Sequence, residues 1–110
     1  RNYAPDPIHT GIDFSAGAGT PVYAAMDGIV LLRLTNPKTF GNHIVLYHGG
    51  EVTTMYAHLS AFGSCRVGDR VMQGEVVGYV GSTGLSTGDH LHFEYQKNGA
   101  AYDPRTILPI

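Results

Sequence analysis

The sequence predicts an all-β domain built mainly from antiparallel strands. The 110 residues include 15 Gly and 7 Tyr, with Val and Ile in short runs, and no long segment has the apolar periodicity of a helix. A chain of this length is large enough for one hydrophobic core and too short for a separate regulatory module. Residues 1–110 are therefore expected to form one domain.

Six segments have the composition of strands, because each is rich in apolar or β-branched residues and is bounded by Gly, Asn, Pro or Asp. Short loops between them predict an all-β meander. In chain order, the expected strands are Thr20 to Ala25, Gly28 to Leu34, Asn42 to Tyr47, Val52 to His58, Val76 to Val80 and His90 to Gln96.

Two parts of the chain resemble one another weakly. Residues 19–22, followed by 27–30, are echoed by residues 68–71, followed by 76–80. The echo fits an internal repeat, and it equally fits two hairpins that use the same turn chemistry.

Composition excludes several kinds of partner and site. A net charge of -2 without any run of Lys or Arg gives no electrostatic footprint for nucleic acid or an anionic membrane. No apolar run reaches the length of a membrane helix. The single Cys65 excludes an intrachain disulfide and a Cys-built zinc site, and is expected to be a packing residue. The chain opens with Arg1, which is typical of a processed piece.

The last predicted strand carries the pattern His90-Leu91-His92-Phe93-Glu94. A two-residue step along a strand points both imidazoles and the carboxylate to one face, with the imidazoles about 7 Å apart along the chain. One histidine can then bind a metal while its neighbour faces a substrate. Taken alone, the pattern also fits a solvent-facing strand.

A second pair, His9 and Asp13, lies at the entry to a probable strand, with Gly11 allowing a bend between them. A neutral nitrogen and an anionic oxygen suit Zn²⁺, although turn residues would give the same pattern. Together with one histidine of the 90/92 pair they make three ligands with an open position, which is typical of catalytic rather than structural zinc. The other histidine and His58 are then free to handle protons.

The remaining polar candidates are less specific. Regular alternation predicts that Thr54, Tyr56 and His58 share one face. His43 and His48 are interpreted as surface or packing residues. Glu94 either orients a ligand histidine or is exposed at the strand end. The phenols of Tyr3 and Tyr56 are candidates for a hydrogen bond to a developing oxyanion.

Three segments, 9–13 (His-Thr-Gly-Ile-Asp), 55–60 (Met-Tyr-Ala-His-Leu-Ser) and 90–94, together closely resemble the lysostaphin-like (LytM-type) family of zinc endopeptidases. Residues 19–25, 67–71 and 78–84 also resemble the family, although Pro7 and Asp89 depart from it. The resemblance implies a two-sheet antiparallel β domain of the barrel-sandwich hybrid type, with a groove carrying the metal site. It further implies one Zn²⁺ held by His9, Asp13 and His92, and catalytic roles for His58 and His90.

The function that this resemblance implies is hydrolysis of peptide stems or cross-bridges of bacterial peptidoglycan, with zinc-bound water as the nucleophile. A periplasmic or extracellular place in the cell envelope is implied, or a phage lysin, and the domain is expected to be monomeric. The alternative is a non-catalytic domain of the same fold that binds peptidoglycan or activates another hydrolase. Degenerate relatives lose metal ligands, whereas all five site positions are filled in this chain.

Overall fold

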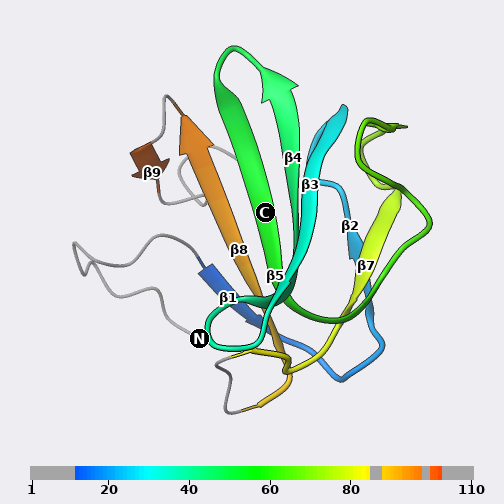
Figure 1. The fold of residues 1–110 in the computed structure, drawn as a ribbon, viewed down its shortest axis with the longest axis vertical. Coiled ribbons are helices and arrows are strands. Elements are labelled where there is room, and N and C mark those ends of the chain that lie inside the picture. The colour runs from blue at the N-terminus through cyan, green and yellow to red at the C-terminus, as the bar shows by residue number, and fades with distance from the viewer. Residues whose placement is uncertain (1–11, 85–87, 98–99, 103–110) are drawn as a thin grey trace.

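The structure is a computed structural model that describes residues 12–84, 88–97 and 100–102. The described ranges form strands and no helix (Figure 1), and every strand pairing is antiparallel. No helix capable of spanning a membrane occurs in them. The predicted all-β antiparallel fold is confirmed. In chain order the strands are β1 (Ile12–Ser15), β2 (Pro21–Tyr23), β3 (Gly28–Asn36), β4 (Gly41–Gly49), β5 (Val52–Phe62), β6 (Arg70–Val71), β7 (Val76–Val80), β8 (His90–Lys97) and β9 (Ala100–Tyr102).

All six predicted strands are present, the probable strand expected at Asp13 is present as β1, and two further strands were not predicted. β6 and β9 have two and three residues, which is too short for an alternating pattern to be visible in the sequence. The largest error in length is in β5, which continues four residues beyond the predicted end, to Phe62.

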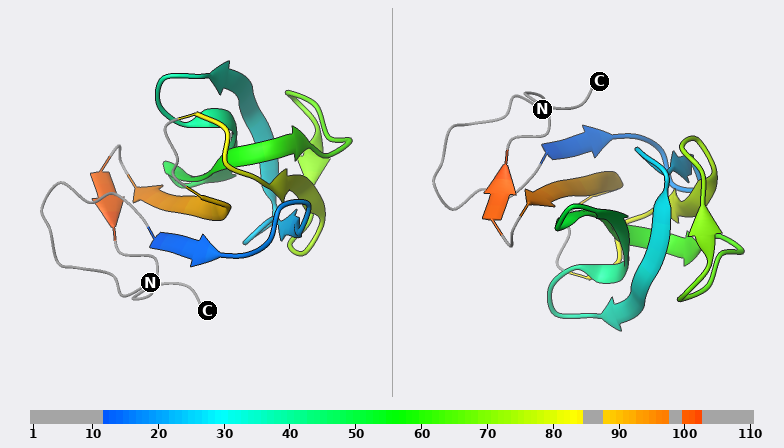
Figure 2. Two further views of the ribbon diagram at one scale, coloured as in Figure 1. Left: turned by 90° about the horizontal axis from the view of Figure 1, so that it is seen from below. Right: turned by 90° about the horizontal axis from the view of Figure 1, so that it is seen from above.

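The strands form one continuous hydrogen-bonded sheet with a branch. Its main order is β1-β8-β5-β4-β3-β6, and β7 leaves this path to pair with β5 and with β2. The first part of β5 pairs with β4 and β8, and its last residues pair with β7. The two predicted layers are thus joined through β5, and Figures 1 and 2 show the resulting sheet as strongly curved and open.

Hydrogen bonds support the interpretation of the sequence echo as an internal repeat. Gly19 N–H donates to the Val80 carbonyl at 2.8 Å, and Gly68 N–H donates to the Val30 carbonyl at 2.9 Å. Val80 and Val30 each donate back to the residue that follows the glycine, at 2.8 and 2.9 Å. β2 therefore pairs with β7 of the second unit, while β6 pairs with β3 of the first.

The core lies inside the curve of this sheet. Its fully buried side chains come from β3, β4, β5, β6 and β7, so most of the described strands contribute to one apolar cluster. Cys65 is buried in this cluster, which confirms its role in packing, and burial raises the pKa of its thiol. The largest of these side chains are Val30, Ile44, Leu46, Tyr56, Leu59, Val71 and Val77.

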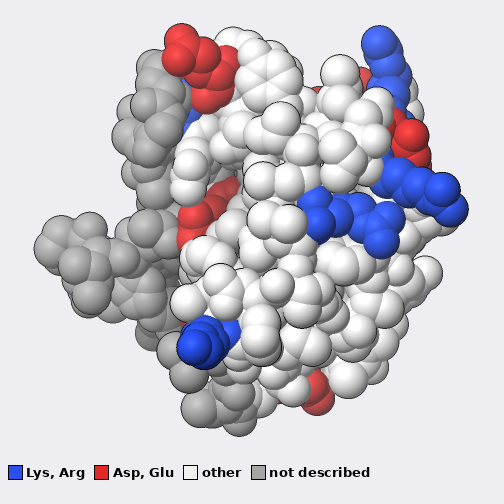
Figure 3. All heavy atoms as spheres, viewed as in Figure 1, with Lys and Arg blue, Asp and Glu red and all other residues white. Residues whose placement is uncertain are grey.

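Charged side chains on the outer surface are mixed in sign. On the face shown in Figure 3, Lys and Arg lie dispersed among acidic and uncharged side chains of the described residues. A large basic patch, as nucleic-acid binding requires, is absent from the described part of that face.

Candidate active site

Three adjacent strands bring the candidate residues together. β8 lies between β1 and β5, with His92 opposite Asp13 on one side and opposite Ala57 on the other. Phe93 is buried in the core at 4% exposure, so strand alternation points His90, His92 and Glu94 to the other face of β8.

Asp13 and His92 converge across the β1–β8 pair. The Asp13 Oδ1 lies 2.8 Å from His92 Nδ1, although the two residues are 79 positions apart in the chain. The same oxygen lies 4.0 Å from His90 Nε2. Two of the predicted ligands are therefore in contact, while the third, His9, lies outside the described residues.

His58 reaches this cluster by breaking the alternation of β5. Its backbone φ is +62°, in the left-handed region that a non-glycine residue seldom adopts. As a result, the centroid of its ring lies 4.9 Å from the ring centroid of His90 and 6.1 Å from that of His92. The prediction that His58 shares a face with Tyr56 is wrong, because the bulge turns the side chain from the core face to the site face.

Backbone contacts from two loops hold His58 in this conformation. Its N–H donates to the Phe40 carbonyl at 2.8 Å, and its Nδ1 lies 2.7 Å from the Thr83 carbonyl oxygen. Because a carbonyl only accepts, Nδ1 carries the proton and the neutral ring keeps its lone pair on Nε2. Burial, the largest influence, lowers the pKa of His58, which favours this neutral form.

His90 is oriented in the same way. Its Nδ1 lies 2.9 Å from the Gly88 carbonyl oxygen, so the Nδ1–H donates there and Nε2 is left as the acceptor. The side chain is 23% exposed, against 15% for His92. His90 is thus the more accessible of the two to solvent.

His92 lies between two carboxylates. Its Nδ1 faces Asp13, and its Nε2 lies 2.9 Å from Oε2 of Glu94. Burial is the largest single influence and lowers the pKa of His92, but the hydrogen bonds and charges of Glu94 and Asp13 together raise the pKa above its ordinary value. Glu94 is 3% exposed, so the alternative of exposure at the strand end is wrong, and its contact with His92 leaves the orienting role as a prediction.

The donor chemistry of this pair fits a zinc ion. An aspartate oxygen and an imidazole nitrogen that face one another at 2.8 Å are both common zinc ligands, and a cation would replace the proton between them. Across the described ranges, no three His, Cys, Asp or Glu side chains are grouped to hold one ion. His9, the third ligand that the resemblance implies, lies outside these ranges.

Two site residues, Phe40 and Thr83, were not found from the sequence. Phe40, in the loop between β3 and β4, stacks on the His92 ring with centroids 5.9 Å apart and an interplanar angle of 18°. Thr83 Oγ1 donates to the Leu59 carbonyl at 2.7 Å while its own carbonyl accepts from His58. Both lie in loops, whose contacts have no periodic signal.

Tyr56 is not part of the site, contrary to the sequence-based candidate role. Its hydroxyl accepts from Ala25 N–H at 2.9 Å and lies 2.9 Å from Thr54 Oγ1, on the core face. Burial raises the pKa of Tyr56. His48 extends the same network through Thr54, and His43 is buried beside Phe40, so both histidines are packing residues as interpreted. Tyr3 lies outside the described residues.

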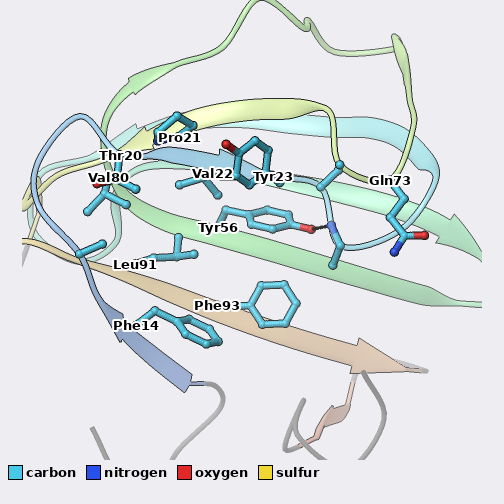
Figure 4. Close-up of a pocket in the computed structure, with 14 residues that line it drawn as sticks. Phe14, Thr20, Pro21, Val22, Tyr23, Tyr56, Gln73, Val80, Leu91 and Phe93 are labelled. Atoms are coloured by element: carbon cyan, nitrogen blue, oxygen red, sulfur yellow. Dashed lines mark hydrogen bonds between the residues drawn. The ribbon is translucent and has the colours of Figure 1, made fainter. Parts of the chain in front are cut away.

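An apolar cavity of about 550 Å³ lies on the opposite face of β8. Phe14, Leu91 and Phe93 point into it, facing Val22 and Tyr23 of β2 (Figure 4). Among the described residues, no histidine or carboxylate lines this cavity. The cluster of Asp13, His58, His90 and His92 on the other face is therefore the better candidate active site.

Two glycines with similar backbone conformations allow a test of whether the Thr83 carbonyl orients His58. Gly41 has φ +61° and a Cβ there would overlap the backbone of Thr83, whereas Gly50 has φ +58° and open space around it. Gly50→Ala is expected to lose about 1 kcal/mol of stability through left-handed strain, and Gly41→Ala more than that, because its Cβ would also overlap Thr83. Only Gly41→Ala should also lower kcat, by about 10-fold or more, because it displaces the carbonyl that orients His58.

Melting temperatures and cleavage rates of both variants give the answer. Equal rates in Gly41→Ala and Gly50→Ala would contradict the assigned role of the Thr83 carbonyl.

The chain is similar in sequence to known peptidases. The model of Peptidase family M23 matches residues 7–104. The chain is 45% identical over 100 residues to the DD-carboxypeptidase/endopeptidase Mpg of Neisseria meningitidis, and 40% over 99 residues to the peptidoglycan DD-endopeptidase ShyC of Vibrio cholerae. It is 39% identical over 117 residues to the glycyl-glycine endopeptidase ALE-1 of Staphylococcus capitis. These matches cover 91%, 90% and 96% of the chain but only 23%, 22% and 32% of the relatives.

Solved structures show the same fold. A zinc-containing peptidase from Vibrio cholerae superposes with a TM-score of 0.81 at 35% identity, covering 86% of this chain and 28% of that one. The similarity in structure thus extends over most of the chain.

Proposed function

Because the chain belongs to Peptidase family M23, we propose that this peptidase is a zinc-dependent endopeptidase that hydrolyses peptide cross-links of bacterial peptidoglycan. The observation that carries the proposal is the convergence of Asp13, His58, His90 and His92 on one face of β8. The names of Mpg and ShyC support the substrate class.

The proposed ligands of the ion are His9, Asp13 and His92. Asp13 and His92 are already in contact, and both present donor atoms that zinc accepts. When bound, the ion would polarise the peptide carbonyl as a Lewis acid and provide an activated water as the nucleophile.

His58 and His90 are proposed to handle protons and charge. Each donates its Nδ1–H to a backbone carbonyl, which leaves Nε2 able to accept a proton in the neutral ring. The lowered pKa of His58 keeps it neutral near pH 7, as a general base requires. His90 is proposed to protonate the leaving amine or to stabilise charge on the reacting carbonyl, in each case after its Nε2 has taken up a proton.

The protein is proposed to act in the cell envelope, in the periplasm or outside the cell, since that is where peptidoglycan is found. The rest of the relatives' length lies outside the part that this chain matches. The domain is proposed to act as a monomer, because Asp13, His58, His90 and His92 meet without a residue from a second copy.

Direct stem-to-stem cross-links are the proposed preferred substrate over glycine bridges. The proposal rests on the resemblance of residues 93–94 (Phe-Glu) to relatives acting on such walls, and on the names of Mpg and ShyC. ALE-1, by contrast, is named a glycyl-glycine endopeptidase, which corresponds to a preference for glycine bridges.

Mass spectrometry of fragments released from walls of both cross-link types tests the function and the preference together. Release of stem peptides from directly cross-linked walls, at a higher rate than cleavage of pentaglycine bridges, is expected. Faster turnover of pentaglycine would overturn the preference alone, and the absence of fragments from either wall would overturn the proposed function.

A further inference from the structure

We propose that Glu94 is a positioning residue that holds and strengthens His92 as a zinc ligand, an inference that rests on the proposed function. Glu94 lies two residues after His92 on β8 and shares its face. Its Oε2 lies 2.9 Å from His92 Nε2, and its Oε1 accepts from Gln96 Nε2 at 3.0 Å.

Burial of the Glu94 carboxylate lowers the stability of the fold unless other groups stabilise its negative charge. Glu94 is 3% exposed, and a buried carboxylate destabilises a fold unless it is hydrogen-bonded and balanced by positive charge. Asp13 places a second negative charge on the other side of the His92 ring. A divalent cation beside the ring would be attracted by both charges.

The geometry fixes the ring in two ways. The Nε2–H of a neutral His92 donates to Glu94, which leaves the lone pair on Nδ1, the atom that faces Asp13. Phe40 stacks on the ring face at 5.9 Å, so the ring is restrained both along its plane and across it. Hydrogen bonding to a carboxylate also increases the basicity of an imidazole ligand.

Three variants of the 110-residue chain separate this role from a purely structural one. Glu94→Gln keeps the shape and an accepting oxygen but removes the charge. The double variant Glu94→Gln/Gln96→Glu exchanges the two side chains, so that an amide at position 94 can donate to a carboxylate at position 96. The group that faces His92 remains neutral. Glu75→Gln removes a carboxylate from an exposed turn, where it accepts from Met72 N–H at 3.1 Å, and serves as the control for net charge.

Zinc affinity is measured by competition with a chromophoric chelator, stability by melting in excess chelator, and ligand geometry by the visible spectrum of the Co²⁺-loaded protein. Both Glu94 variants are expected to bind zinc about 10- to 100-fold more weakly, with an altered Co²⁺ spectrum. The double variant should melt at a higher temperature than the single one without regaining affinity. Glu75→Gln should remain within about twofold of the wild type, because solvent screens a distant surface charge.

Two outcomes would overturn the inference. One is wild-type zinc affinity and Co²⁺ spectrum in Glu94→Gln, and the other is an affinity in the double variant that recovers together with its stability. If the wild-type chain binds zinc and the Glu94 variants bind it more weakly, but the wild type cleaves no peptidoglycan peptide, the proposed function is overturned and the inference stands. A wild-type chain that binds no zinc would overturn both.

Discussion

His92→Ala is expected to lose both zinc and peptidase activity, whereas His90→Ala should retain close to one zinc per chain and lose turnover by roughly 10²-fold or more. The two residues share a face of β8, but only His92 lies within 2.8 Å of Asp13. His90 Nε2 is 4.0 Å from the same oxygen, and its Nδ1 is bonded to the Gly88 carbonyl. Removing a histidine outside the coordination sphere leaves the ion in place but takes a proton or charge partner from the transition state.

Zinc content by atomic spectroscopy and cleavage rate are measured on the same preparations. His58→Ala serves as the matched comparison, because it should behave like His90→Ala. Zinc retained in His92→Ala and lost in His90→Ala would reverse the assignment of ligand and catalyst.

Asp13→Ala is expected to be poor in zinc and inactive. The carboxylate is the only charged group among the proposed ligands, and the two remaining histidines cannot hold an open site against water. The matched control is Asp69→Ala, which removes a carboxylate that accepts from Arg66 N–H at 2.9 Å in an exposed turn.

The control should keep its zinc and its activity even if the turn is destabilised. Full zinc occupancy in Asp13→Ala, measured after dialysis against metal-free buffer, would show that Asp13 is not a ligand.

Strand periodicity was sufficient to predict much of the candidate site. A step of two residues places His90 and His92 on one face and Leu91, between them, on the core face, as the structure has them. Asp13 was expected at the entry to a strand, and it lies in β1. The residues alone grouped Asp13 with one histidine of the 90/92 pair, and the resemblance to a known family selected His92, which is 79 residues away in the chain.

Periodicity failed where the backbone leaves regular strand geometry. His58 would face the core beside Tyr56 in an unbroken strand, and its left-handed φ of +62° turns it to the site. Phe40 and Thr83 contribute through loop contacts to residues far along the chain, which depend on how two loops meet. Such contacts leave no mark in composition or spacing.

The central claim is metal-dependent cleavage of peptidoglycan cross-links by the His58, His90 and His92 cluster. Its most direct test is to strip the domain of metal, verify the loss by atomic spectroscopy, and follow release of cross-linked stem peptides by mass spectrometry before and after one equivalent of Zn²⁺ is added. Negligible release from the stripped protein and recovery with about one zinc per chain is the predicted result. Full cleavage by the verified metal-free protein would contradict the account.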